Sequence, residues 1–121
     1  MTHDATAGGW PETSVAIVGM ACRFPGADDL ASFWEMLCAG RDTLYRDPAR
    51  AEPGYQPVRG LVSEPEGFDA AFFGIPTREA CYLNPQHRLF LETSHAALEN
   101  AGCDPARFDG AISVYASCSQ N

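Results

Sequence analysis

The stretch from Ser14 to Gly19 is apolar and β-branched, and it lacks the alternation of polar and apolar residues that marks a half-buried strand. Such a run is typical of a strand covered on both faces, as in a parallel or mixed sheet. A turn over residues 22–26, broken by Pro25 and Gly26, follows the run, and a helical pattern follows the turn. This order of strand, turn and helix predicts an α/β fold.

The first expected helix starts after Asp28 or Asp29, because either side chain can accept a hydrogen bond from the first helical turn. Gly40 stands where a left-handed cap can end the helix. The apolar residues in between recur with helical spacing and form one stripe, namely Leu30, Phe33, Trp34, Leu37 and Cys38.

The middle of the chain shows no regular period. Residues 41–67 carry four prolines, so we expect a long irregular segment with one short strand at residues 58–62 and no domain boundary. An aromatic-rich cluster follows, and its bulk and apolar character predict a place in the core. The cluster consists of Phe68, Phe72, Phe73 and Ile75.

A second helix is predicted from Asn84, with Pro85 at its first position, to about Ala101, with Gly102 just beyond its end. Its expected buried stripe consists of Leu91, Leu98 and Ala101, flanked by Ala97 and Phe90. A short helical turn is expected from Asp104, and a second strand over residues 111–116. We divide the chain into a disordered lead-in, residues 1–13, and a single domain, residues 14–121.

Composition limits the classes of function. The net charge is −8 and every basic residue is an arginine. Nucleic acids and anionic membranes bind basic surfaces, so neither is an expected partner. An apolar content of 45% is typical of a globular domain, which at this length buries about two thirds of its unfolded surface. The sequence has no apolar run of about 20 residues and no secretory signal, which predicts a cytoplasmic protein.

The five cysteines are widely spaced and odd in number. Zinc sites need clustered ligands, and small disulfide scaffolds need more cysteine than this, so we expect reduced and mostly buried thiols. They are Cys22, Cys38, Cys81, Cys103 and Cys118.

Four patterns in the sequence contain residues of types found in reactive or ligand-binding sites. Residues 19–26 lie between a strand and a helix but lack the glycine pattern and the lysine of a phosphate loop. His87 and His95, eight residues apart, are too distant to share a metal ion. Arg88 and Glu92 are expected to form a helix-surface ion pair. Cys118 has no following helix and no evident base to activate it as a nucleophile. The sequence therefore predicts no catalytic, cofactor-binding or metal-binding residue.

Three runs of sequence together resemble the start of a β-ketoacyl synthase (ketosynthase) domain of a modular type I polyketide synthase. They are VAIVGMACRFPG at 15–26, FDAAFFGI at 68–75 and LNPQHRLFLE at 83–92. The resemblance covers residues 14–121 and implies a partial thiolase-like fold, the N-terminal portion of the first half of a layered α/β/α/β/α sandwich. Small departures occur at Pro76-Thr77, at Asn84 and at 117–119. His87 is similar to its counterpart in hybrid peptide–polyketide ketosynthases.

The resemblance implies decarboxylative Claisen condensation of carrier-protein-bound acyl and malonyl units. The cysteine and two histidines that catalyse it in the family are expected beyond the equivalent of Asn121, so no catalytic role is transferred to a residue here. The expected partners are the remainder of a ketosynthase or neighbouring megasynthase domains, an acyl carrier protein in the complete enzyme, and further copies of the chain. The alternatives are a non-catalytic, truncated ketosynthase that serves as a structural or docking module, and an unrelated small α/β binding domain.

Overall fold

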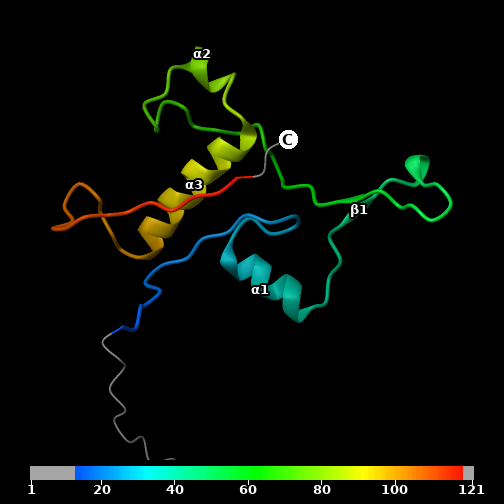
Figure 1. The fold of residues 1–121 in the computed structure, drawn as a ribbon, viewed down its shortest axis with the longest axis horizontal. Coiled ribbons are helices and arrows are strands. Elements are labelled where there is room, and N and C mark those ends of the chain that lie inside the picture. Colours follow the sequence, from blue (N-terminus) through cyan, green and yellow to red (C-terminus); the bar gives the residue numbers. More distant parts are fainter. Residues whose placement is uncertain (1–12, 119–121) are drawn as a thin grey trace, which may run out of the picture.

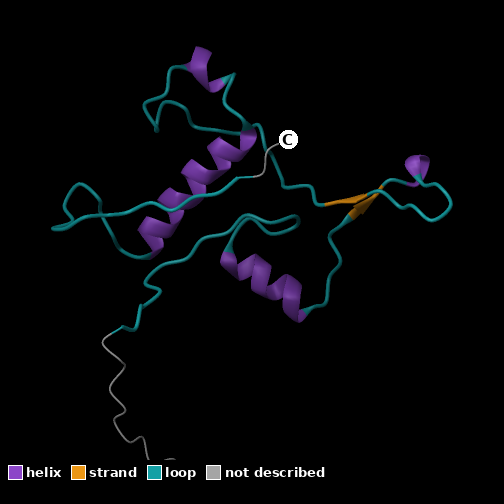
Figure 2. Ribbon diagram, in the orientation of Figure 1, coloured by secondary structure: helices purple, strands orange, loops and turns teal. Residues whose placement is uncertain are grey.

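A computed structural model describes residues 13–118 of the chain. Its helices and strands follow the order α1 (Leu30–Cys38), β1 (Tyr45–Arg46), the 3-10 helix η1 (Pro48–Arg50), β2 (Val58–Arg59), α2 (Thr77–Ala80) and α3 (Pro85–Asn100). Figure 1 shows two long extended segments, at the two ends of the described chain, beside the α3 helix. Loops and turns make up much of the chain (Figure 2). The expected lead-in, residues 1–13, lies outside the described residues except for Thr13.

Both long helices begin and end where the sequence predicts. Asp29 caps α1 by accepting a hydrogen bond from the Ser32 amide at 2.7 Å, and Asn84 caps α3 by accepting one from the Gln86 amide at 2.9 Å. Gly40 and Gly102 follow the two C-terminal ends with φ angles of 61° and 64°. This left-handed conformation is available to glycine at little cost, so each helix stops there.

The segment between the helices forms a small hairpin. β1 and β2 pair in antiparallel fashion, with Tyr45 opposite Arg59 and Arg46 opposite Val58. A second, tighter bridge joins Glu52 and Tyr55 across the Pro53-Gly54 turn. The predicted short strand at residues 58–62 is thus confirmed at its first two residues. The structure adds its partner, which the sequence pattern did not predict.

The two predicted strands at residues 14–19 and 111–116 are wrong as paired strands, because both segments are extended without a neighbouring strand in residues 13–118. Their apolar side chains are largely exposed, with Val15 at 92%, Ile17 at 80% and Val114 at 73%. A β-strand needs a partner for its amide and carbonyl groups, and the described residues supply none to these two segments. The turn expected at Asp104 forms, and the Arg107 amide donates to its carbonyl.

Few side chains of the described part are buried. The apolar ones are Ala27 and Met36, and the charged one is Arg88. The predicted stripe of α1 is only partly covered, since Leu30 and Phe33 are half-buried while Trp34 is 67% exposed. Met36, which lies outside the stripe, turns toward the Gly26 turn. In the aromatic cluster, Phe72 is exposed, and Phe68 and Phe73 are half-buried and stacked on each other. The predicted core position of this cluster is therefore wrong for the chain by itself.

The total exposed surface agrees with this sparse core. The chain exposes 10406 Å². A compact protein of this mass exposes about 6,400 Å², and its unfolded chain about 19,000 Å². The chain thus buries about 45% of its unfolded surface, so the two thirds expected from its length is wrong. The cysteine thiols are likewise less buried than expected. All five are free, but Cys22 and Cys103 are half-buried and the other three are exposed.

Candidate functional site

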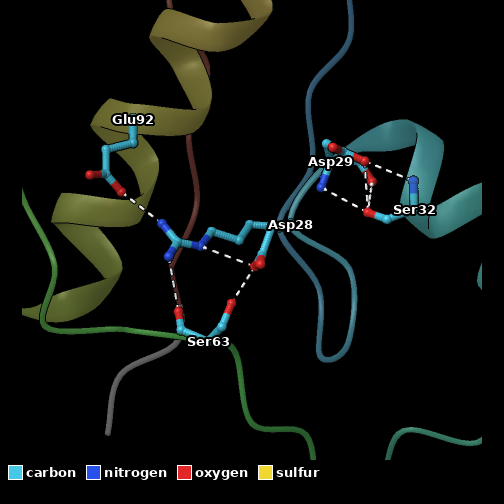
Figure 3. Close-up of polar contacts among 6 residues, drawn as sticks. Asp28, Asp29, Ser32, Ser63 and Glu92 are labelled. Atoms are coloured by element: carbon cyan, nitrogen blue, oxygen red, sulfur yellow. Dashed lines mark hydrogen bonds and ion pairs between the residues drawn. The ribbon is translucent and has the colours of Figure 1, made fainter.

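Arg23 joins three separate segments of the chain. Its guanidinium donates to the Glu92 carboxylate on α3 at 3.0 Å and to the Ser63 carbonyl at 2.9 Å. Its Nε lies 3.7 Å from the Asp28 carboxylate, to which the Ser63 hydroxyl also donates. Figure 3 shows Asp28, Ser63 and Glu92 converging from different elements on this guanidinium. The arrangement fixes the turn before α1, the loop around residue 63 and α3 relative to one another.

Arg88 forms a second cluster at the start of α3. It is 8% exposed, and its guanidinium donates to the Glu66 carboxylate at 3.0 Å and to the Leu83 carbonyl at 2.8 Å. The predicted ion pair between Arg88 and Glu92 is therefore wrong. Helical side chains lean toward the N-terminus of their helix, so Arg88 reaches back to Leu83 while Glu92 meets Arg23.

The first extended segment packs closely on the end of α3. The Met20 amide donates to the Asn100 side chain at 3.0 Å. A Cβ atom added to Gly19 would lie 2.5 Å from the Ala97 carbonyl oxygen and 2.7 Å from the Ala101 amide nitrogen. Only glycine allows this approach without displacement of the backbone. Gly19, which the sequence pattern placed at the end of a strand, therefore serves as a contact point between two segments.

A groove of about 710 Å³ runs along α3, between residues 21–24 and residues 116–118. Cys22, His87 and Cys118 line it together with the apolar side chains of Phe24, Leu89 and Phe90. A smaller hollow of about 320 Å³ is also lined by Cys22 and Arg23, and His95 lines it beside Phe72 and Phe73. The groove thus brings together His87 and Cys118, which belong to two separate patterns in the sequence.

One of the two thiols in this groove, Cys22, has a shifted pKa. Burial, and to a smaller extent the nearby Asp29 carboxylate, raise the pKa of the Cys22 thiol above its ordinary value. A raised pKa keeps a thiol protonated and unreactive at neutral pH. His87 is exposed, and His95 lies 3.5 Å from the Glu99 carboxylate. Among the described residues, no three potential ligands are grouped to hold a metal ion.

The positive charge that residues 19–26 could offer to a phosphate is already paired. Arg23 supplies the positive charge within the run, and two carboxylates already compensate it. The sequence predicts a turn at residues 22–26. The Phe24–Ala27 bridge closes this turn with two backbone hydrogen bonds. The sequence pattern missed the Arg23 and Arg88 clusters because their partners lie far along the chain. No short spacing could have indicated these contacts.

Comparison with known proteins identifies the scaffold. Residues 12–121 match the family model of the β-ketoacyl synthase, N-terminal domain. The chain belongs to this family. It is 45% identical over 121 residues to a phenolphthiocerol/phthiocerol polyketide synthase of Mycobacterium tuberculosis, in an alignment that covers 90% of the chain and 8% of the relative. It is 46% identical over 102 residues to an erythronolide synthase of Saccharopolyspora erythraea, covering 79% of the chain and 3% of that protein.

Solved structures of ketosynthases share its fold. The ketosynthase from module 6 of the bacillaene synthase of Bacillus subtilis 168 is 39% identical with a TM-score of 0.62, over 72% of this chain and 16% of that one. The oxazolomycin ketosynthase domain of Streptomyces albus JA3453 is 40% identical with a TM-score of 0.62, over 71% and 18%. The predicted fold class, a portion of a thiolase-like ketosynthase, is thereby confirmed, as is the polyketide synthase resemblance.

This ketosynthase segment is a small part of its relatives, at 8% of the mycobacterial polyketide synthase and 16% of the solved ketosynthase. Its relatives are parts of far larger multidomain proteins, which supports association of such a segment with other megasynthase domains. Within residues 13–118, no helix has the length and apolar character to cross a bilayer.

Proposed function

We propose that this ketosynthase segment forms the N-terminal part of a condensing domain that joins carrier-protein-bound acyl and malonyl units by decarboxylative Claisen condensation. The observation that carries the proposal is the pair of exposed, apolar, unpaired extended segments, residues 14–20 and 111–118. Strands of this composition are stable when neighbours cover both of their faces. The remainder of a ketosynthase domain would supply those neighbours.

Energetics support this assignment. Covering a few hundred Å² of apolar surface contributes several kcal/mol at about 25 cal/mol per Å². That amount is comparable with the net stability of a whole domain. Association with the remaining part of the domain would therefore complete a core that the described residues form only sparsely. The segment's own role is positional, because the Arg23 and Arg88 clusters hold its loops on α3 and leave the groove beside α3 open.

The catalytic cysteine and histidines are proposed to come from the remainder of the domain. The segment offers no activated thiol of its own at Cys22, whose pKa burial raises. The groove beside α3, with Cys22, His87 and Cys118 in its lining, is proposed as a surface that the remainder of the domain covers.

A chimera tests the proposal. Residues 12–121 would replace the matching segment of the Mycobacterium tuberculosis phenolphthiocerol/phthiocerol polyketide synthase, and the chimera would receive acyl- and malonyl-loaded carrier proteins. We expect a β-ketoacyl product, detected by mass spectrometry. Ile17→Asp with Val114→Asp in the chimera should abolish product, while Val58→Asp on the hairpin should not. A folded chimera without product would contradict a condensing role and favour the non-catalytic docking module.

A further inference from the structure

The hairpin region, residues 41–59, differs in charge from the rest of the chain. It carries four of the eight arginines and two of the four tyrosines. Its four arginines and three acidic residues give a net charge of +1, while the other residues combine four arginines with thirteen acidic residues to −9. Because charges more than about 8 Å away are screened at physiological salt, a ligand at the hairpin encounters mainly its local charge.

The hairpin region projects from the molecule (Figure 1). β1 and β2 contact each other, and they contact no other helix or strand of the described residues. Its large side chains are open to solvent, including Tyr55 at 61% exposure and the guanidinium side chain of Arg50 at 75%.

Two arginines of the hairpin region share one carboxylate. Arg50 and Arg59 each lie 3.7 Å from the same Asp47 oxygen, and the Asp47 side chain is largely buried. Arg59 also lies over the Tyr45 ring, 5.3 Å from its centroid, which holds the guanidinium in place. The arginines and Tyr55 border a hollow of about 190 Å³. Asp47 lines the hollow as well, so the lining holds two guanidinium groups against one carboxylate, a net charge of +1.

This chemistry differs from that of the two extended segments. Residues 14–20 are apolar and uncharged, as expected of a surface that another part of the same domain covers. The cores of protein interfaces are depleted of charged residues, but arginine and tyrosine are enriched among the residues that contribute most to binding a partner. The hairpin region therefore has the composition of a docking surface for a separate protein.

We propose that the hollow bordered by Arg50, Tyr55 and Arg59 docks an acidic segment of a partner protein, with one partner carboxylate bound to the two guanidinium groups beside Asp47. Guanidinium and carboxylate groups match in geometry and form charge-assisted hydrogen bonds. The Tyr55 ring supplies apolar contact beside them. This inference does not rest on condensing activity, because it concerns a face of the molecule away from the groove along α3.

Fluorescence polarisation with the full chain tests the docking surface. The probe is a fluorescein-labelled peptide of alternating Glu and Ala, and the same peptide with Gln in place of Glu is the reference. We expect the Glu peptide to bind and the Gln peptide not to bind. The double substitution Arg50→Glu with Arg59→Glu should weaken the affinity for the Glu peptide by about tenfold or more. The matched control, Arg78→Glu with Arg107→Glu, makes the same change in net charge away from the hairpin and should leave the affinity within about twofold.

Further arms of the experiment separate the alternatives. Tyr55→Ala leaves the charge unchanged and should still weaken binding, and circular dichroism should show that every variant keeps the helix content of the parent chain. Equal weakening by the two double variants would overturn the proposal in favour of non-specific attraction. Competition by inorganic phosphate at lower concentration than the peptide, or tighter binding of a DNA oligonucleotide, would overturn it as well.

Discussion

The α3 region and the hairpin region differ in the range of the contacts that hold them. α3 receives contacts from distant parts of the chain, including the Met20 amide, the Arg23 guanidinium and the Glu66 carboxylate. The ion pairs of the hairpin region join residues within the same short stretch, as between Asp42 and Arg46. Apolar surface and long-range contacts gather at α3, while charge and local contacts gather on the hairpin. One chain thus contains both an incomplete core at α3 and a surface element, the hairpin region, whose contacts are local.

The largest expected difference between the two regions concerns self-association. With Ile17 and Val114 largely exposed, we expect the isolated chain to form oligomers or aggregates. Covering a few hundred Å² of such surface contributes several kcal/mol. Ile17→Ser with Val114→Ser should lower the mass measured by light scattering after size-exclusion chromatography, whereas Val58→Ser on the hairpin should not. A monodisperse parent chain with a sharp thermal transition would refute the idea of an unfinished core.

Removal of Arg88 is expected to have the next largest effect. Arg88→Ala leaves a cavity and removes hydrogen bonds to Glu66 and Leu83, so the free energy of unfolding should fall by about 1.5–3 kcal/mol. The matched hairpin variant, Arg46→Ala, breaks an exposed ion pair and should cost less than about 1 kcal/mol. Urea denaturation followed by tryptophan fluorescence measures both. Equal losses would mean that burial does not distinguish the two arginines.

Gly19→Ala tests the close contact between the first extended segment and α3. The new methyl group would meet the Ala97 carbonyl, so we expect a loss of about 1–3 kcal/mol from overpacking. Hydrogen exchange should rise at the Met20 amide and at the end of α3. Gly54→Ala should instead disturb the hairpin alone, because Gly54 has a φ of 81° but no atom near its added methyl group. An unchanged Met20 amide in Gly19→Ala would disprove the tight approach.

The smallest expected effects follow pH. Hydrogen bonds from the Ser32 side chain and backbone lower the pKa of Asp29 below its ordinary 3.8. A hydrogen bond from the Leu44 amide, and then one from Arg46, lower the pKa of Asp42 in the same way. Each carboxylate therefore stabilises its region above the unfolded pKa, and this contribution disappears as pH falls through the lowered folded pKa.

Acid titration by NMR should detect these local losses. We expect fraying of the first turn of α1 and of the Asp42 turn in the same acidic range. Asp29→Asn should remove the pH dependence of α1 and leave that of the hairpin region unchanged. Fraying of α1 at neutral pH, or a pH response that persists in Asp29→Asn, would contradict the role of this cap.

Local signals predicted the helices, because their evidence lies within a few residues. Asp29 and Asn84 are followed directly by the amides that they cap, and Gly40 and Gly102 supply the left-handed residues that end each helix. The turn at Pro25-Gly26 could be predicted for the same reason, because its signal also lies in adjacent residues. Motif order then identified the ketosynthase family and its fold class, which the comparisons confirm. The assignment of no catalytic residue to this segment stays a prediction.

Only the tertiary structure decided how these elements meet. The sequence alone determined the caps, the helix lengths and the family, since each depends on neighbouring residues or on a fixed run of letters. It paired Arg88 with Glu92, but Arg88 joins Glu66 and Glu92 joins Arg23, which lies sixty-nine positions away. Apolar runs at residues 14–19 and 111–116 predicted strands, yet a strand exists only where another strand supplies hydrogen bonds. Pattern along a chain determines local conformation, whereas pairing, burial and long-range charge contacts depend on which segments meet in space.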